Sequence, residues 1–320
     1  MSEPSWSSLL DEEATQAAAL LAAVLPRPLH TLGLDGVRAF AAPQTPPRTT
    51  PMAEVREHRA GSTGVRVREY RPRVGTSSPA VLYLHGGGFT VGSLDGVDEL
   101  CRRIAAGADC AVFSVEYRLA PEHPYPAALD DVRAAYAWLV DGAISLDVDP
   151  DRVAVAGDSA GAGLATSLCL DLRERGHAQP VLQLLVYPAV DDSFARRSWT
   201  DFADAPLLGA DDARWFWRQY VGEAAVAPDE LAAPMRATSL AGLAPAHVIT
   251  AEVDPLRDDA EAYADRLAAE GVAVTRKRYA GVFHCFFTEV ETYATARRAV
   301  SEACARLRAA FGSEDPDAAG

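Results

Sequence analysis

Lysine is nearly absent from this chain of 320 residues: Lys277 is the only one, and arginine carries the remaining positive charge. Aspartate and glutamate outnumber lysine and arginine by 45 to 30, which gives a formal net charge of -15 at pH 7. Such a charge repels phosphate backbones and anionic membrane surfaces. We therefore expect no nucleic-acid partner.

Cysteine is sparse as well, and no apolar run is long enough to cross a bilayer. The five cysteines are odd in number, widely spaced and free of CxxC pairs, which argues against a disulfide framework and against a zinc site. The first residues, MSEPSWSSLLDEE, are acidic where a secretory signal needs positive charge. These features predict a cytoplasmic protein without a membrane span and without a bound metal.

The chain has many short apolar runs, which are typical of strands buried on both faces of a parallel sheet. Four of them lie at residues 81–84, 110–117, 152–157 and 181–188. Helical patterns alternate with these runs, and the alternation continues after residue 245 up to a last helix near 289–311. Repeated β-α units of this kind predict an α/β fold with a mostly parallel central sheet flanked by helices.

Two segments interrupt this rhythm. Residues 8–25 have the spacing of an amphipathic helix, and residues 191–240 contain no good strand but many aromatic side chains. We expect both segments to form a helical cap over a pocket, although a helix packed on the core would also be aromatic-rich. The aromatic residues expected to line the pocket are Trp199, Trp215, Phe216 and Trp217. The predicted division is N-terminal cap helices at 1–52, a first part of the core at 53–190, a cap insertion at 191–240, a second part of the core at 241–311 and a disordered tail at 312–320.

The sharpest motif is Gly157-Asp158-Ser159-Ala160-Gly161, which lies between an apolar strand and an Ala/Leu-rich helix. Small residues are needed on both sides of Ser159, because larger side chains would collide with the strand and the helix. The turn places the hydroxyl at the positive end of the helix dipole, where developing negative charge is favoured. This context predicts that Ser159 is a catalytic nucleophile.

A second motif, His-Gly-Gly-Gly-Phe at 85–89, follows another predicted strand. Consecutive glycines expose backbone N–H groups and let a substrate oxygen approach, as an oxyanion hole requires. A phosphate-binding loop is the alternative, but neither GxGxxG nor GxxxxGK[ST] completes that motif. We assign the oxyanion donors to Gly87, Gly88 and Ala160.

A nucleophilic serine needs a base and an acid. Lys277 lies inside a predicted strand, far from the serine turn, which disfavours a Ser-Lys pair. In folds with this strand-turn-helix motif the chain order is serine, acid, histidine, and His284 is the only histidine late enough. Asp254 follows the strand HVITAEV and is the predicted acid. Its close rivals are Glu252, Asp258 and Asp259.

Five motifs in this order resemble the hormone-sensitive-lipase-like family of α/β-hydrolases, in its bacterial esterase branch. They are HGGGF, YRLAPEHPYPAALDD, GDSAG, DPLRDD and the late histidine, and the similarity covers roughly residues 79–311. It implies hydrolysis of a small-molecule ester, no cofactor, and a cap built from N-terminal helices and an insertion after the sixth strand. Two residues depart from the family: Ala162 and Cys285 stand where glycine is common. Cys285, beside the predicted base, would narrow the pocket or make the enzyme sensitive to thiol reagents.

The string from Tyr117 to Asp131 contains no obvious nucleophile or base. Its three prolines predict an ordered bend, across which Arg118 would pair with Glu122. The resemblance further implies a cis peptide bond before Pro121 or Pro126.

These residues predict a serine carboxylesterase that hydrolyses short- to medium-chain acyl esters through an acyl-enzyme intermediate. Two alternatives remain open. The protein is an amidase or other acyl hydrolase of the same fold, since these motifs do not identify the leaving group; or it binds a ligand without catalysis, as plant gibberellin receptors that resemble this family do. We also expect a homodimer through the last strand, although its Arg276-Lys277-Arg278 run is also how a monomer protects a sheet edge.

Overall fold

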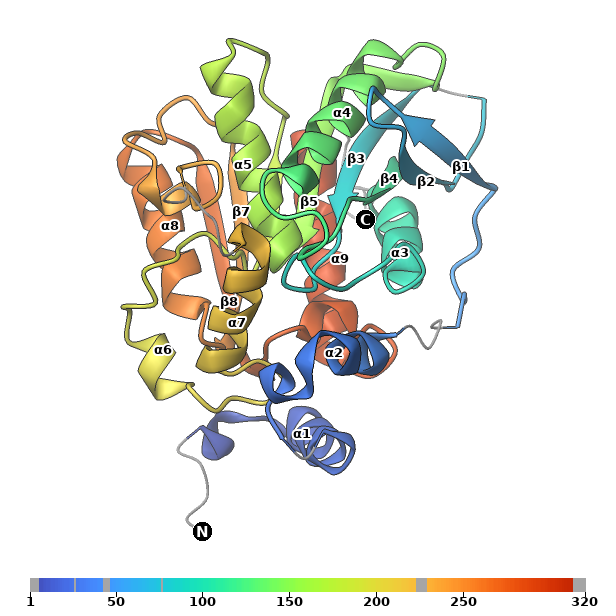
Figure 1. The fold of residues 1–320 in the computed structure, drawn as a ribbon. Coiled ribbons are helices and arrows are strands. Elements are labelled where there is room, and N and C mark those ends of the chain that lie inside the picture. The colour runs from blue at the N-terminus through green and yellow to red at the C-terminus, as the bar shows by residue number, and fades with distance from the viewer. Residues whose placement is uncertain (1–5, 26, 43–46, 76, 223–228, 313–320) are drawn as a thin grey trace.

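The computed structural model describes residues 6–25, 27–42, 47–75, 77–222 and 229–312. One sheet of eight strands runs through the molecule in the order β1-β2-β4-β3-β5-β6-β7-β8 (Figure 1). β2 pairs antiparallel with β1 and with β4, and the remaining neighbours pair parallel. The predicted α/β fold is confirmed. The strands are β1 (Glu54–Ala60), β2 (Val65–Arg71), β3 (Ser78–Leu84), β4 (Ala111–Glu116), β5 (Val148–Asp158), β6 (Gln183–Val186), β7 (Ala246–Val253) and β8 (Val274–Phe283).

Helices cover both faces of the sheet, which explains why the central strands are apolar without interruption. Side chains alternate between the two faces of a strand, so Leu82 and Leu84 of β3 face one core and Val81 and Tyr83 face the other. The first core lies under α4 (Ala127–Asp141), α5 (Ala160–Glu174) and α8 (Arg257–Ala269), and the second lies under α3 (Asp98–Ala108) and α9 (Ala294–Ala310).

Four other helices gather at one end of the sheet, toward the bottom of Figure 1. They are α1 (Glu12–Val24), α2 (Gly33–Ala41), α6 (Ser198–Asp201) and α7 (Ala210–Val221). The last two lie in the segment between β6 and β7, where the insertion was expected. A small apolar cluster joins the two parts, since Leu29 and Val37 pack with Leu208 and Phe216.

The stretch Glu12–Ala41 is, by length and composition, the one candidate membrane segment among the described residues. It contains two separate helices, α1 and α2, with a 3-10 turn at Leu29–Leu32 between them. A single apolar stretch of this kind near the start of a chain is only a weak indication of a span or of a signal sequence.

The proline-rich bend is ordered as expected, and the peptide bonds before Pro121 and Pro126 are both cis. The predicted pair between Arg118 and Glu122 is wrong. Arg118 donates to Asp131 at 2.8 Å, because Asp131 is almost fully buried and needs a cationic partner. Glu122 instead accepts two hydrogen bonds from Arg38 of α2, at 2.6 and 2.7 Å, and so ties the N-terminal helices to the bend.

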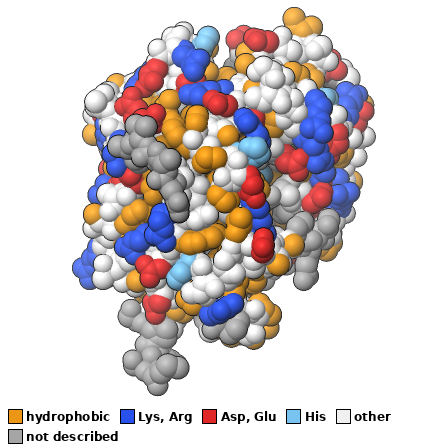
Figure 2. All heavy atoms as spheres, in the orientation of Figure 1, with side chains coloured by type: hydrophobic (Ala, Val, Ile, Leu, Met, Phe, Trp, Pro, Cys, Tyr) orange, Lys and Arg blue, Asp and Glu red, His pale blue; other side chains and the backbone are white. Residues whose placement is uncertain are grey.

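Charged side chains of both signs lie next to one another on the face drawn in Figure 2. Many of these charges form local ion pairs within the chain, such as Arg236 with Asp192 at 2.8 Å. Of the predicted tail at 312–320, residues 313–320 lie outside the described residues.

Candidate active site

Ser159 stands on the tight turn between β5 and α5. Its φ of 53° and ψ of -118° are unusual for a residue with a side chain. A Cβ atom at Gly161 would collide with the carbonyl oxygens of Leu84 and His85, and one at Gly157 would collide with Gly161. The steric reason for the small neighbours, inferred from the motif, therefore holds in the structure.

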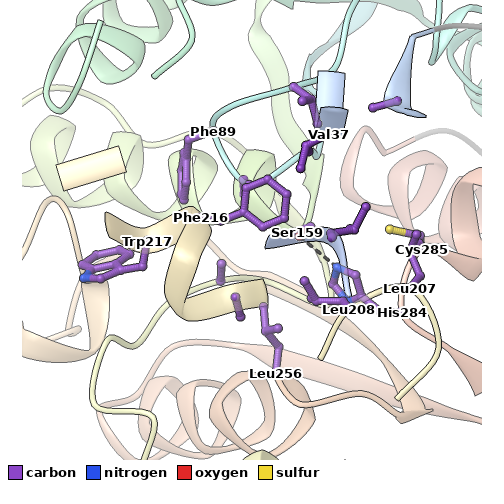
Figure 3. Close-up of a pocket in the computed structure, with 18 of the residues that line it drawn as sticks. Val37, Phe89, Ser159, Leu207, Leu208, Phe216, Trp217, Leu256, His284 and Cys285 are labelled. Atoms are coloured by element: carbon purple, nitrogen blue, oxygen red, sulfur yellow. Dashed lines mark hydrogen bonds between the residues drawn. The ribbon is translucent and has the colours of Figure 1, made fainter. Parts of the chain in front are cut away.

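The structure brings Ser159, His284 and Asp254 together although 125 residues separate the first two. His284 Nε2 lies 3.0 Å from Ser159 Oγ, and His284 Nδ1 lies 2.7 Å from Asp254 Oδ2. All three residues are buried, with exposed fractions of 7, 3 and 0% in the order serine, histidine, aspartate. Figure 3 shows the contact between Ser159 and His284 at the floor of the pocket.

The rival carboxylates have other partners. Glu252 accepts from the backbone N–H of Gly281 at 2.9 Å. Asp258 accepts from the N–H of Ser198 at 2.9 Å, and Asp259 accepts from the indole N–H of Trp199 at 2.7 Å. Asp254 is the carboxylate that the geometry places on His284, and its second oxygen accepts from the N–H of Leu256 at 2.9 Å.

The charges at this site favour a strong histidine base. Burial lowers the pKa of His284, but the adjacent Asp254 carboxylate outweighs burial and holds that pKa well above its ordinary value. A neutral imidazole with its proton on Nδ1, bonded to Asp254, leaves Nε2 free to accept the Ser159 proton.

The glycine loop after β3 lines the same pocket as Ser159. Gly87 and Gly88 have φ values of 119° and 57°, which favour glycine, and together with Ala160 they line the same pocket as Ser159. Among the described residues, none accepts a hydrogen bond from the N–H groups of these three residues. Those groups are therefore available to a substrate oxygen.

Asp158 is a residue whose role the sequence reasoning missed. Its carboxylate is buried beneath the glycine loop, where it accepts from the N–H of Gly86 at 3.0 Å and from the hydroxyl of Tyr83 at 2.8 Å. Burial raises the pKa of Asp158 to about 6. Asp158 therefore connects the turn that carries Ser159 to the glycine loop. Its position directly before Ser159 was the signal in the sequence that could have indicated this role.

The pocket is a cavity of about 220 Å³ with mostly apolar walls, to which both parts of the predicted cap contribute. Phe216 and Trp217 of α7, labelled in Figure 3, line it, and so does Trp199. The expectation for Trp215 is wrong: it packs edge-on against Phe216, with ring centroids 5.1 Å apart, and is not among the lining residues. Successive residues of a helix point about 100° apart. Phe216 therefore points into the pocket, while Trp215, the residue before it, points away.

Cys285 lines the pocket beside His284 and has a φ of 72°, a left-handed conformation that glycine adopts more easily. The thiol therefore occupies space that a glycine would leave open. All five cysteines are free thiols, and Cys285 is the partly exposed one. Among the described residues, no group of three or more His, Cys, Asp or Glu side chains is placed to hold a metal ion.

A strand-turn-helix serine, a histidine after the last strand and a parallel sheet are the architecture of the α/β-hydrolases. A family model described as the alpha/beta hydrolase fold matches residues 81–288 of this chain. The chain belongs to this family, in its hormone-sensitive-lipase-like branch.

Several relatives and solved structures are similar over most of this chain. It is 39% identical to "Carboxylesterase NlhH" of Mycobacterium tuberculosis over 297 residues, which cover 89% of this chain and 92% of that one. It is 41% identical to "Carboxylic ester hydrolase LipN" of the same organism over 248 residues, 76% of this chain and 66% of that one. The crystal structure of a hyperthermophilic esterase from Pyrobaculum calidifontis superposes with a TM-score of 0.85 at 38% identity, covering 94% of this chain and 98% of that one.

Proposed function

We propose that this protein is a carboxylesterase whose triad is Ser159, His284 and Asp254. The observation that carries the proposal is the continuous hydrogen-bonded chain from Ser159 Oγ through the imidazole to the buried carboxylate. Ester hydrolysis itself is also the activity in the names of the relatives, carboxylesterase and carboxylic ester hydrolase. The protein is thus an ester-hydrolysing enzyme, and the residue roles are our proposal.

In the first half of the reaction, His284 Nε2 takes the hydroxyl proton as Ser159 Oγ attacks the ester carbonyl. The resulting oxyanion accepts hydrogen bonds from the N–H groups of Gly87, Gly88 and Ala160. The imidazolium then gives its proton to the leaving alkoxide, and the alcohol departs. Water repeats these steps on the acyl-enzyme and releases the carboxylic acid.

The apolar cavity supports an uncharged substrate with short to medium chains. Its volume of about 220 Å³ accommodates a compact ester, and most of its lining is apolar. We expect the optimum at acyl chains of about two to eight carbons, since each buried methylene adds roughly 0.8 kcal/mol until the wall is reached.

The alternatives differ from the esterase in measurable ways. An amidase would hydrolyse an anilide at a rate comparable with the matching phenyl ester. A ligand-binding protein without catalysis would lack a functional base, whereas His284 is in place between Ser159 and Asp254. The geometry therefore favours turnover over capture.

We further propose a cytoplasmic homodimer. β8 is an edge strand whose residues 275–278 are exposed, and its three cations each pair with a carboxylate of the same chain: Asp265, Glu302 and Glu261. Because these charges are already compensated, two copies can approach along this edge without uncompensated repulsion. Light scattering should give twice the chain mass, and a value of 34.1 kDa would overturn the dimer.

The division into a core at 53–190 and 241–311 and a cap at 1–52 and 191–240 is also a proposal. The apolar cluster that joins Leu29 and Val37 to Phe216 supports it, because both cap parts then bury their apolar faces on each other.

The test of the triad is Ser159→Ala. The alanine fits the turn, so the protein should fold, and kcat for p-nitrophenyl butyrate should fall by about 10⁴-fold or more. A purified variant that retains a tenth of the wild-type activity would exclude Ser159 as the nucleophile.

A further inference from the structure

A second cavity lies behind one wall of the catalytic pocket. We call the pocket that contains Ser159 the inner cavity and the second one the outer cavity; their volumes are about 220 and 440 Å³. The outer cavity lies between α1 and the loop that joins α6 to α7. Its apolar side is formed by Ala18, Leu21 and Ala22 of α1 and by Leu25, the residue that follows α1.

Neighbouring residues of the same two segments line the two cavities. In the N-terminal segment, Leu29 lines the inner cavity, while its neighbours Pro28 and His30 line the outer one. In the loop before α7, Leu208 lines the inner cavity and Gly209 lines the outer one. Such alternation indicates that these two segments separate the inner cavity from the outer one.

Leu207 lines both cavities. In the inner cavity it lies on the His284 and Cys285 side of Ser159 (Figure 3). Removing its side chain would therefore join the two spaces, whereas removing that of Leu208 would only enlarge the inner one.

The backbone at Leu207 is strained. Its φ is 66°, and the N–H of Leu208 donates to the carbonyl of Pro206 at 2.8 Å, which closes a three-residue turn around Leu207. A turn of this kind with positive φ is rare, and a bulky residue at its centre is an outlier. Strain of this kind persists where surrounding structure holds it, often at ligand-binding sites. Here the turn directs a leucine into the wall.

We propose that Leu207 is the specificity-determining residue that sets the upper limit of ester chain length, by closing the inner cavity against the outer one. This inference rests on the proposed esterase function. The ligand that meets Leu207 is a linear alkyl chain, which belongs to either the acyl or the alcohol half of the ester.

The experiment compares Leu207→Ala with Leu208→Ala, the matched control that removes an equal side chain from the inner cavity alone. The readout is the ratio of kcat/KM for a ten-carbon chain to that for a four-carbon chain. One arm uses p-nitrophenyl esters of increasing acyl length, and the other uses acetates of primary alcohols of increasing length. The arm in which the ratio changes identifies the half of the ester that passes Leu207.

Each methylene that enters the outer cavity should raise kcat/KM about fourfold, the factor that corresponds to roughly 0.8 kcal/mol per buried CH₂. A ten-carbon chain has two methylenes more than the expected limit of about eight carbons. If both enter the outer cavity, the ratio should rise by about 16-fold in Leu207→Ala, and it should rise by no more than about fourfold in Leu208→Ala. Equal changes in the two variants, or no change in either arm for Leu207→Ala, would overturn the proposal.

Two further variants keep the test decisive. Leu207→Gly removes the same side chain and suits the positive φ, so it reports on the wall if the alanine variant does not fold. Adding Leu21→Trp to Leu207→Ala refills the outer cavity from α1 and should return the ratio to the wild-type value. If the wild type does not hydrolyse the four-carbon esters, the esterase function fails; if it does and the ratios stay equal, only the role of Leu207 fails.

Discussion

Replacing Asp254 with asparagine should reverse the tautomer of His284 without altering the fold. One carboxylate oxygen accepts from the N–H of Leu256 at 2.9 Å, and the other accepts from His284 Nδ1 at 2.7 Å. In the variant the amide oxygen must remain on the Leu256 N–H, because the amide NH₂ cannot accept that bond. The NH₂ group then faces Nδ1 and donates to it.

The consequence follows from the proton on the imidazole. A neutral ring that accepts at Nδ1 carries its proton on Nε2, 3.0 Å from Ser159 Oγ, and cannot take the serine proton. In other serine triads the same change lowers kcat by about 10⁴-fold. We expect a loss of this size here, equivalent to about 5.4 kcal/mol of transition-state stabilisation.

The assay is p-nitrophenyl butyrate hydrolysis at neutral pH, with Asp258→Asn as the matched control. Asp258 is a rival carboxylate four residues away, but it bonds Ser198 and Arg257 rather than His284. That control should retain activity within about threefold, since it touches none of the three triad residues. More than a tenth of wild-type kcat in Asp254→Asn, or an equal loss in Asp258→Asn, would refute the assignment of the acid.

Three further predictions concern pH and packing. Since Asp254 holds the pKa of His284 well above its ordinary value, kcat/KM should rise with pH with an apparent pKa above about 6.5, and a maximum near pH 4 would contradict a histidine base. Gly161→Ala should lower the free energy of unfolding by about 3 kcal/mol in urea denaturation, because its Cβ would collide with the carbonyls of Leu84 and His85; an unchanged midpoint would show that the turn can relax. Burial raises the pKa of Asp259 to about 7, so the folded protein binds a proton that the unfolded chain has released, and stability should fall as pH rises from about 4 to about 7. Asp259→Asn should flatten that slope in denaturation curves at pH 5 to 8; an unaltered slope would assign it to other groups.

The sheet could be predicted because a strand that is buried on both faces has an uninterrupted run of apolar residues. Val81, Leu82, Tyr83 and Leu84 are all apolar, since each faces one of two cores. The last helix was less accurate: α9 begins at Ala294 rather than near 289. Phe286–Thr288 form a separate 3-10 turn first, and the periodic pattern did not distinguish this turn from the helix that follows.

The positions of the proposed triad residues could be predicted for a similar reason. Ser159, Asp254 and His284 directly follow β5, β7 and β8, which run parallel in the same sheet, so the topology brings their side chains to one edge. The hydrogen-bond partners of Asp158 and Glu122 could not be predicted. Gly86 lies 72 residues from Asp158 in the sequence, and Arg38 lies 84 residues from Glu122. A short-range pattern carries no information on such pairs.

The residues that we propose to select the substrate also could not be predicted from short-range patterns. The wall between the two cavities joins Leu29, from the N-terminal segment, to Leu207 and Leu208, from the insertion, and neither segment has a motif at these positions. Both segments pack on the carboxyl end of the sheet without belonging to it, so their sequences can change while β5, β7 and β8 still place the triad. The residues proposed for the reaction and those proposed for chain-length selection therefore lie in separate parts of this fold, which is why the sequence predicted the reaction closely and the pocket wall only in outline.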